Sequence, residues 1–136
     1  NLCLKLDSRV ISIAAGGSAC AAATESGRVY AWGFGLVGLG PNVCSSTGPA
    51  LIPPPLFGRT EFDPDIKVIK VVAGLNSFAA ITNHGDLYTW GRNRCGLLGL
   101  GHLKDHAFPA RVNLGGRVTD VSCGADHAFA LTQPNF

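Results

Sequence analysis

One pattern occurs three times along this chain, and a repeat constrains the fold more than any single segment does. Residues 10–33 and 68–91 both open on Val-Ile, continue through small and apolar residues, and close on Tyr-x-Trp-Gly. A third copy starts at Val118 and ends before its own Tyr-x-Trp-Gly. We therefore expect one domain over 1–136, with repeats at 10–52 and 68–112 and a truncated repeat at 118–136.

The closing segment of the second copy predicts a strand that follows a tight turn. In an extended backbone, Leu87 and Thr89 point to one face, while Tyr88 and Trp90 point to the other. The preceding turn ends in Gly85, and a glycine with positive φ commonly closes a hairpin. Glycines after Trp90 disfavour both a helix and a long strand, so the chain is expected to leave the sheet there as a loop.

Each complete unit supplies about four short strands, and no window shows the apolar period of a helix. Repeats of about 40–50 residues with four strands each are typical of propeller blades. A β-sandwich is the alternative, but it does not need repeated Trp-Gly exits. We therefore predict an all-β partial β-propeller of about two and a half four-stranded blades. In the second unit the strands are expected at 68–73, 78–82, 86–90 and near 110–112.

Composition excludes several classes of function. With 46% hydrophobic and 15% charged residues, the chain is globular rather than disordered. The net charge is only +2 and the basic residues are scattered, so there is no DNA signature. The longest nearly apolar run, Val10–Ala23, contains glycines and is too short to span a membrane.

Two further features bear on context. The chain begins at Asn1 and has no methionine, so we expect a fragment whose targeting segment lies upstream. Its five cysteines form no Cys-x-x-Cys pair, which suits neither a zinc site nor a disulfide framework. A reducing compartment follows.

Several stretches imitate chemical motifs. Residues 33–38 read G-x-G-x-x-G, but Gly40-Pro41 prevents the helix that would receive a pyrophosphate. Residues 91–98 have the spacing of a phosphate loop without its Lys and Ser or Thr. His102 and His106 need a helix to share a face, and glycine and proline flank them. We predict no catalytic residue, no metal site and no cofactor.

Residues 68–101 resemble the regulator of chromosome condensation repeat. They read Val-x-x-Val-x-x-Gly, a strand of small and hydrophobic residues, and then Thr-x-x-Gly-x-Leu-Tyr-x-Trp-Gly-x-Asn-x-x-Gly-x-Leu-Gly-Leu-Gly. Nearly the whole chain follows this pattern, with two departures. The segment 32–40 is three residues shorter than 90–101, and an insertion around 56–65 lengthens the connection between the two complete units. Each difference is expected to alter one surface loop.

The resemblance implies a seven-bladed propeller whose last blade is completed by strand exchange with an N-terminal part. The insertion and the chain end are most similar to those of the mitochondrial, G-exchanging-factor-like branch of the family. That likeness implies a protein-binding propeller, guanine nucleotide exchange on a small GTPase, a mitochondrial location, and association with mitochondrial ribosomal RNA and ribosome assembly factors. The alternative is a non-catalytic protein-interaction scaffold of the nucleus or cytoplasm.

Partner binding is expected on the loops that follow the Trp-Gly strands, because such folds place recognition on the loops of the blades. Exchange would require no catalytic acid or base, since it depends on preferential binding of the nucleotide-free GTPase. The expected contact residues are Arg92, Asn93, Arg94, Lys104, Asp105 and His106.

Overall fold

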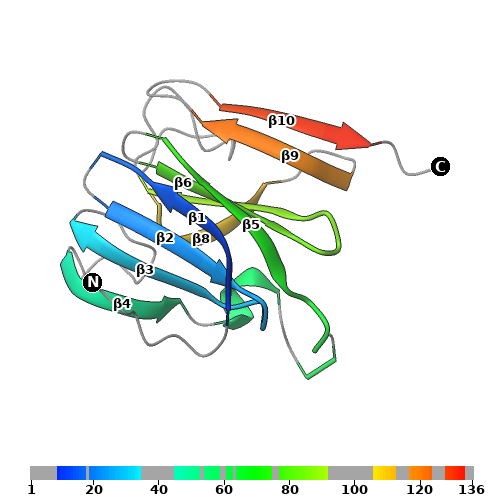
Figure 1. Cartoon of the computed structure of the whole chain (residues 1–136). Helices are drawn as coiled ribbons and strands as arrows, with labels where there is room; N and C mark the ends of the chain where they lie inside the picture. Colours follow the sequence, from blue (N-terminus) through cyan, green and yellow to red (C-terminus); the bar gives the residue numbers. More distant parts are fainter. Residues whose placement is uncertain are drawn as a thin grey trace.

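The computed structural model describes residues 9–17, 19–34, 45–52, 54–58, 61–62, 64–74, 77–91, 106–112, 117–123 and 128–133. The strands of this part form three antiparallel sheets that lie side by side (Figure 1). The first sheet contains β1 (Val10–Ala15), β2 (Ala19–Thr24), β3 (Val29–Phe34) and β4 (Ser45–Ile52), and the 3-10 helix η1 (Pro54–Phe57) follows it. The second contains β5 (Val68–Ala73), β6 (Ser77–Thr82), β7 (Leu87–Gly91) and β8 (His106–Val112), and the third pairs β9 (Arg117–Cys123) with β10 (Ala128–Gln133).

This arrangement is a partial β-propeller, as the repeat predicts. In both four-stranded sheets the strands follow one another in chain order, so each sheet is one blade. The third sheet has the first two strands of another. The four strands expected in the second unit are all present, and β8 starts four residues earlier than residue 110.

The spacing at the start of each unit, Val-x-x-Ile in the first and Val-x-x-Val in the other two, reflects a β-bulge. Residues three apart in a regular strand point to opposite faces. The pairing of β5 with β6 shifts between Val68 and Lys70, and the extra residue brings Val68 and Val71 into the same buried cluster. The register also shifts between Val10 and Ser12 in β1, and where Val118 of β9 pairs with β10.

The second blade is covered on both faces. All five residues of β7 are buried. Tyr88 and Trp90 belong to the cluster shared with the first blade, whereas Leu87 packs with Val118 and Val121 of β9. The predicted separation of Leu87 from Tyr88 and Trp90 is therefore confirmed, and each face meets a different blade.

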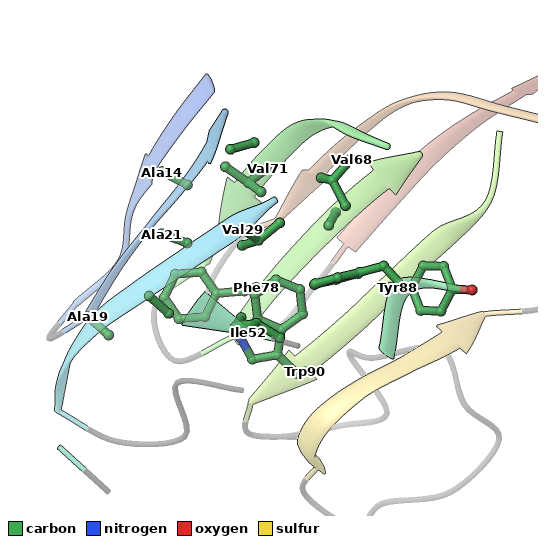
Figure 2. Close-up of a cluster of buried hydrophobic side chains, with 14 residues drawn as sticks. Ala14, Ala19, Ala21, Val29, Ile52, Val68, Val71, Phe78, Tyr88 and Trp90 are labelled. Atoms are coloured by element: carbon green, nitrogen blue, oxygen red, sulfur yellow. The ribbon is translucent and has the colours of Figure 1, made fainter. Parts of the chain in front are cut away.

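Between the first two blades, large side chains pack against small ones. Trp90 is completely buried and stacks on Phe78, with ring centroids 5.6 Å apart. Figure 2 shows these rings in one cluster with the small side chains of β1 and β2, including Ala19 and Ala21. Alanines on one sheet leave the volume that aromatic residues of the next sheet fill, which gives close packing without voids.

The insertion after β4 is more than a surface loop, so that expectation was wrong for its first part. Phe57 of η1 is only 3% exposed, and its ring meets those of Tyr88 and Trp90 edge-on at 5.6 and 5.8 Å. Ile66, near the other end of the insertion, is also buried. Because an apolar ring gains free energy by leaving water, the insertion closes part of the gap between the blades.

The Trp90 packing predicts a large loss of stability on truncation. Trp90→Ala should lower the free energy of unfolding by about 3–5 kcal/mol, because it leaves a cavity between Phe57 and Phe78. Denaturant unfolding of the purified protein measures this loss. Phe62→Ala is the matched control, since Phe62 is 88% exposed and its removal should change stability by less than about 0.5 kcal/mol. Equal losses for the two variants would contradict this assignment of Trp90.

Candidate partner-binding edges of the blades

The strand directions give the blades two edges with different geometry. The hairpin edge contains the turns 25–28 and 83–86, at which β3 and β7 begin. The exit edge contains Phe34 and Gly91, at which those strands end. Since both faces of the second blade are covered, these two edges and the outer strand β8, which bears the exposed Phe108, are where it can meet a partner.

At the exit edge, the glycine of each Trp-Gly pair has a backbone conformation that other residues rarely adopt. Gly33 has φ of 109° and Gly91 has φ of 108°. The pairing with the next strand shifts register at both places, just before the glycine. A bulge of this kind bends the strand, so Trp-Gly marks where the chain turns away from the sheet.

The predicted partner-binding residues belong to the segment that leaves this edge. His106 was expected on a loop but is the first residue of β8, where it pairs with Gly91 at the exit edge; its side chain is outside the described part. Arg92, Asn93, Arg94, Lys104 and Asp105 all lie outside the described residues. Their role as contact residues stays a prediction. Phe34, at the end of β3, places a 67% exposed aromatic side chain on the same edge.

At the hairpin edge, each turn is bonded to the next blade through its glycine. The Val68 N–H donates to the Gly27 carbonyl at 3.2 Å, and the Val118 N–H donates to the Gly85 carbonyl at 2.8 Å. These four residues occupy equivalent positions in successive units. The repeat in sequence is therefore also a repeat of contacts between blades.

The turn glycines are required by conformation and by space. Gly27 and Gly85 have φ of 86° and 84°, which confirms the positive φ expected at Gly85. A Cβ on Gly27 would lie 2.7 Å from the Lys67 Cα, and a Cβ on Gly85 would lie 3.0 Å from the Arg117 Cβ and closer still to its Cγ. The sequence carried a signal for this contact, because a basic residue precedes the first valine of every unit.

Polar side chains add links between the inner strands of neighbouring blades. The Ser12 Oγ accepts from the Val71 N–H at 3.2 Å, and the Lys70 ammonium donates to the Asp120 carboxylate. Ser12, Lys70 and Asp120 are equivalent positions of the three units. Within the second blade, the Arg111 guanidinium donates to Asp86 at 3.0 Å.

Among the described residues, two ionisable groups have shifted pKa values, both from structural causes. The hydrogen bond from Lys70, followed by that from the Val121 N–H and the charge of Lys70, lowers the pKa of Asp120. Burial raises the pKa of Tyr88; the charge of Asp86 adds to this and that of Arg111 opposes it. The Tyr88 hydroxyl therefore keeps its proton at neutral pH, in a role that is structural.

The described part of the chain offers no constellation for catalysis through a metal. Its His, Cys, Asp and Glu side chains form no group of three that could hold a metal ion. Gly33 and Phe34 of the G-x-G-x-x-G string are the end of β3 rather than the start of a helix. No helix in these residues is long and apolar enough to cross a membrane.

Comparison with known families agrees with the repeat and the fold. The model described as "Regulator of chromosome condensation (RCC1) repeat" matches residues 84–131, and a second model with the same description matches 10–38 and 68–97. The chain belongs to the RCC1 repeat family. These matches span all three units that the sequence pattern divides.

Relatives of known sequence carry the likeness further. The human RCC1-like G exchanging factor-like protein is 47% identical over 125 residues, which cover 92% of this chain and 27% of that protein. The mitochondrial RCC1 domain-containing protein RUG3 of Arabidopsis thaliana is 34% identical over 93% of this chain and 29% of its own length. The chain thus spans less than a third of the length of these two relatives.

Two solved structures share the fold. Human WBSCR16 superimposes with a TM-score of 0.94 at 45% identity, over 97% of this chain and 33% of that chain. Prp20p of Saccharomyces cerevisiae, studied for its binding to Gsp1p and histones, superimposes with a TM-score of 0.73 at 27% identity, over 90% of this chain and 30% of its own. The described sheets are therefore blades of an RCC1-type propeller.

The glycine contacts predict an asymmetry between two pairs of variants. Gly85→Ala and Gly27→Ala should each cost about 1–2 kcal/mol from the left-handed backbone alone, with crowding added. Arg117→Ala removes the Cγ and Cδ that crowd position 85, so it should partly rescue Gly85→Ala. Lys67→Ala leaves the Cα and Cβ that crowd position 27, so it should not rescue Gly27→Ala. Double-mutant cycles by denaturant unfolding measure both couplings, and equal couplings would contradict these contacts.

The Asp120 interaction predicts a pH-dependent effect. Folding lowers the pKa of Asp120. The stabilisation from its interaction with Lys70 is therefore fully present above the pKa of an aspartate in the unfolded chain, about 3.9, and is lost as the pH falls below that value. Asp120→Asn and Lys70→Met should both lower the melting temperature at pH 7, and Asp120→Asn should match the parent near pH 2. Glu61→Gln, an exposed control, should melt like the parent at both pH values. An Asp120→Asn deficit that is unchanged at low pH would contradict the interaction.

Proposed function

We propose that this chain is part of a protein-binding RCC1-type propeller that acts as a guanine nucleotide exchange factor for a small GTPase. The observation that carries the proposal is the 47% identity with a protein named as G exchanging factor-like, which continues through the exit of the second Trp-Gly strand. Exchange suits a surface without acid–base chemistry, because binding energy alone can favour the nucleotide-free state of a partner.

The proposed contact surface is the exit edge. It carries Phe34 and His106, and the segment with Arg92, Asn93 and Arg94 departs from it. Exposed aromatic and arginine side chains are the types that most often dominate protein interfaces. The hairpin edge is less suited to this contact, because its turns are already bonded to neighbouring blades.

The proposal includes further blades packed against the first one. Val68 and Val71 of the second blade are 1% and 2% exposed because the first blade covers them. The equivalent Val10 and Ile13 of the first blade are 43% and 68% exposed. Another unit of the same type would bury these side chains as the first blade buries Val68 and Val71, which supports a closed propeller in the whole protein.

We place the whole protein in the mitochondrion, with a role in ribosome assembly there through ribosomal RNA or assembly factors. The resemblance of the insertion to that of the mitochondrial branch and the similarity to the mitochondrial RUG3 support the compartment. The alternative is a non-catalytic scaffold of the nucleus or cytoplasm. It is favoured by Prp20p, which is described by its binding to two kinds of protein.

The two functions separate in one set of measurements on the purified protein. Arg92→Glu/Arg94→Glu should abolish binding of the protein to a responsive small GTPase, and with it the accelerated release of a fluorescent guanine nucleotide from that GTPase. Thermal melting should stay as in the parent. Arg9→Glu/Lys67→Glu makes the same change of charge on the hairpin edge and should retain exchange. Binding without accelerated release across a panel of small GTPases would leave the scaffold as the function. Unchanged affinity of the exit-edge variant at all salt concentrations would exclude this edge.

A further inference from the structure

We propose a second docking element at the hairpin edge: the segment 61–65, whose Phe62 enters an apolar pocket bordered by lysine or arginine side chains on a protein partner. This partner is distinct from the one assigned above to the exit edge. Four observations of this chain carry the inference: the exposure of Phe62, the length of its segment, the fixation of the segment's base, and the charge around its tip.

Phe62 is the most exposed large apolar side chain of the described residues, at 88%. The next in order, Ile13, Phe34 and Leu131, are 65–68% exposed and lie on strands of the sheets. A single exposed apolar residue is common on protein surfaces. Phe62 differs because it lies in an inserted segment that no strand requires.

The insertion is longer than the connection between blades needs to be. Residues 113–116 link β8 to β9, whereas residues 53–67 link β4 to β5 across the equivalent seam. Four residues therefore suffice to pass from one blade to the next. Phe57 and Ile66 anchor the two ends of the longer link, because both are buried. The length of the stretch between them is not required by the passage from one blade to the next.

The base of the segment is held in place, which prepares its tip for binding. The Asn83 side chain donates to the Asp65 carbonyl at 2.8 Å and accepts from the Lys67 N–H at 3.0 Å. Asn83 belongs to the turn 83–86, so these bonds place the segment at the hairpin edge. A loop with fixed ends loses less conformational freedom when it binds, and so retains more of its contact energy as affinity.

The charge at the tip selects the partner. Glu61 and Asp65 are exposed, and Asp63 completes the run Glu-Phe-Asp-Pro-Asp. Glu61 and Asp65 form no ion pair with another described side chain. Glu61 and Asp65 lie on either side of Phe62 in the chain. Their exposed carboxylates repel phosphate, so nucleic acid and anionic lipid are poor ligands, whereas a pocket bordered by basic side chains is complementary.

The test begins with a photoreactive phenylalanine analogue placed at position 62 of the protein in cells. The same analogue at position 108 is the control, because Phe108 is also exposed but lies on β8. We expect one protein to be crosslinked from position 62 alone, and its crosslink to disappear in Glu61→Lys/Asp65→Lys. That protein is then purified, and its Kd for the parent and the variants is measured at low and high salt.

Phe62→Ala should raise this Kd at least about tenfold, and Phe108→Ala should leave it unchanged. Added salt should weaken binding to the parent more than binding to Glu61→Lys/Asp65→Lys. Phe62→Ala should leave the nucleotide exchange proposed for the exit edge unchanged. A failure of the docking proposal can therefore be told apart from a failure of the proposed exchange function. The proposal would be overturned if position 62 crosslinked to a second copy, to nucleic acid or to lipid. It would also be overturned if no crosslink were specific to position 62, or if Phe62→Ala left the Kd unchanged.

Discussion

The arrangement of the blades depends on one backbone contact, the bond from a turn glycine to the first strand of the next unit. Val68 bonds to Gly27 and Val118 bonds to Gly85 in the same way. The contact needs a turn with positive φ and no side chain, because the stem of Lys67 or Arg117 occupies the space beside the glycine. A residue other than glycine would both strain the turn and push the next blade away. The turn therefore has two functions, since it closes a hairpin and positions a neighbouring sheet.

Packing between the blades builds on that contact, and the two seams use different side chains. The first seam has aromatic rings facing alanines, and Phe57 of η1 fills part of the space between the sheets. The second seam is aliphatic, with Leu87 and Val112 against Val118, and the Lys70–Asp120 pair lies at the inner strands. Exposed ion pairs contribute little to stability, so among the described residues the second seam depends mainly on its apolar cluster. The same repeat thus gives seams of different composition.

The sequence was informative wherever structure is determined within one unit. Strand positions, the turn at Gly85 and the two faces of β7 follow from local pattern, because a strand alternates and a turn needs specific residues. The bulge that unites Val68 with Val71 was visible only as an unexplained spacing. Phe57 and the Lys70–Asp120 pair could not be foreseen, since they depend on how separate sheets stack. The expected contact residues at 92–94 and 104–106 are a pattern of charge in the sequence, and no pattern of charge alone determines a binding geometry.

The burial of the strands also limits where function can be placed. A side chain of β7 that contacted a partner would have to leave a cluster shared with the first or the third sheet, at the cost of its packing. Residues that the stacking of blades leaves exposed are not restricted in this way. Among the described residues they include Phe34 at the exit edge, where Trp-Gly turns the backbone out of the sheet, Phe108 on the outer strand β8, and Phe62 on the insertion. A repeat of this kind can diversify at the exit edge and around Phe62 while Phe57 keeps its place in the first seam, because neither place contributes to the contact between turn glycine and next strand.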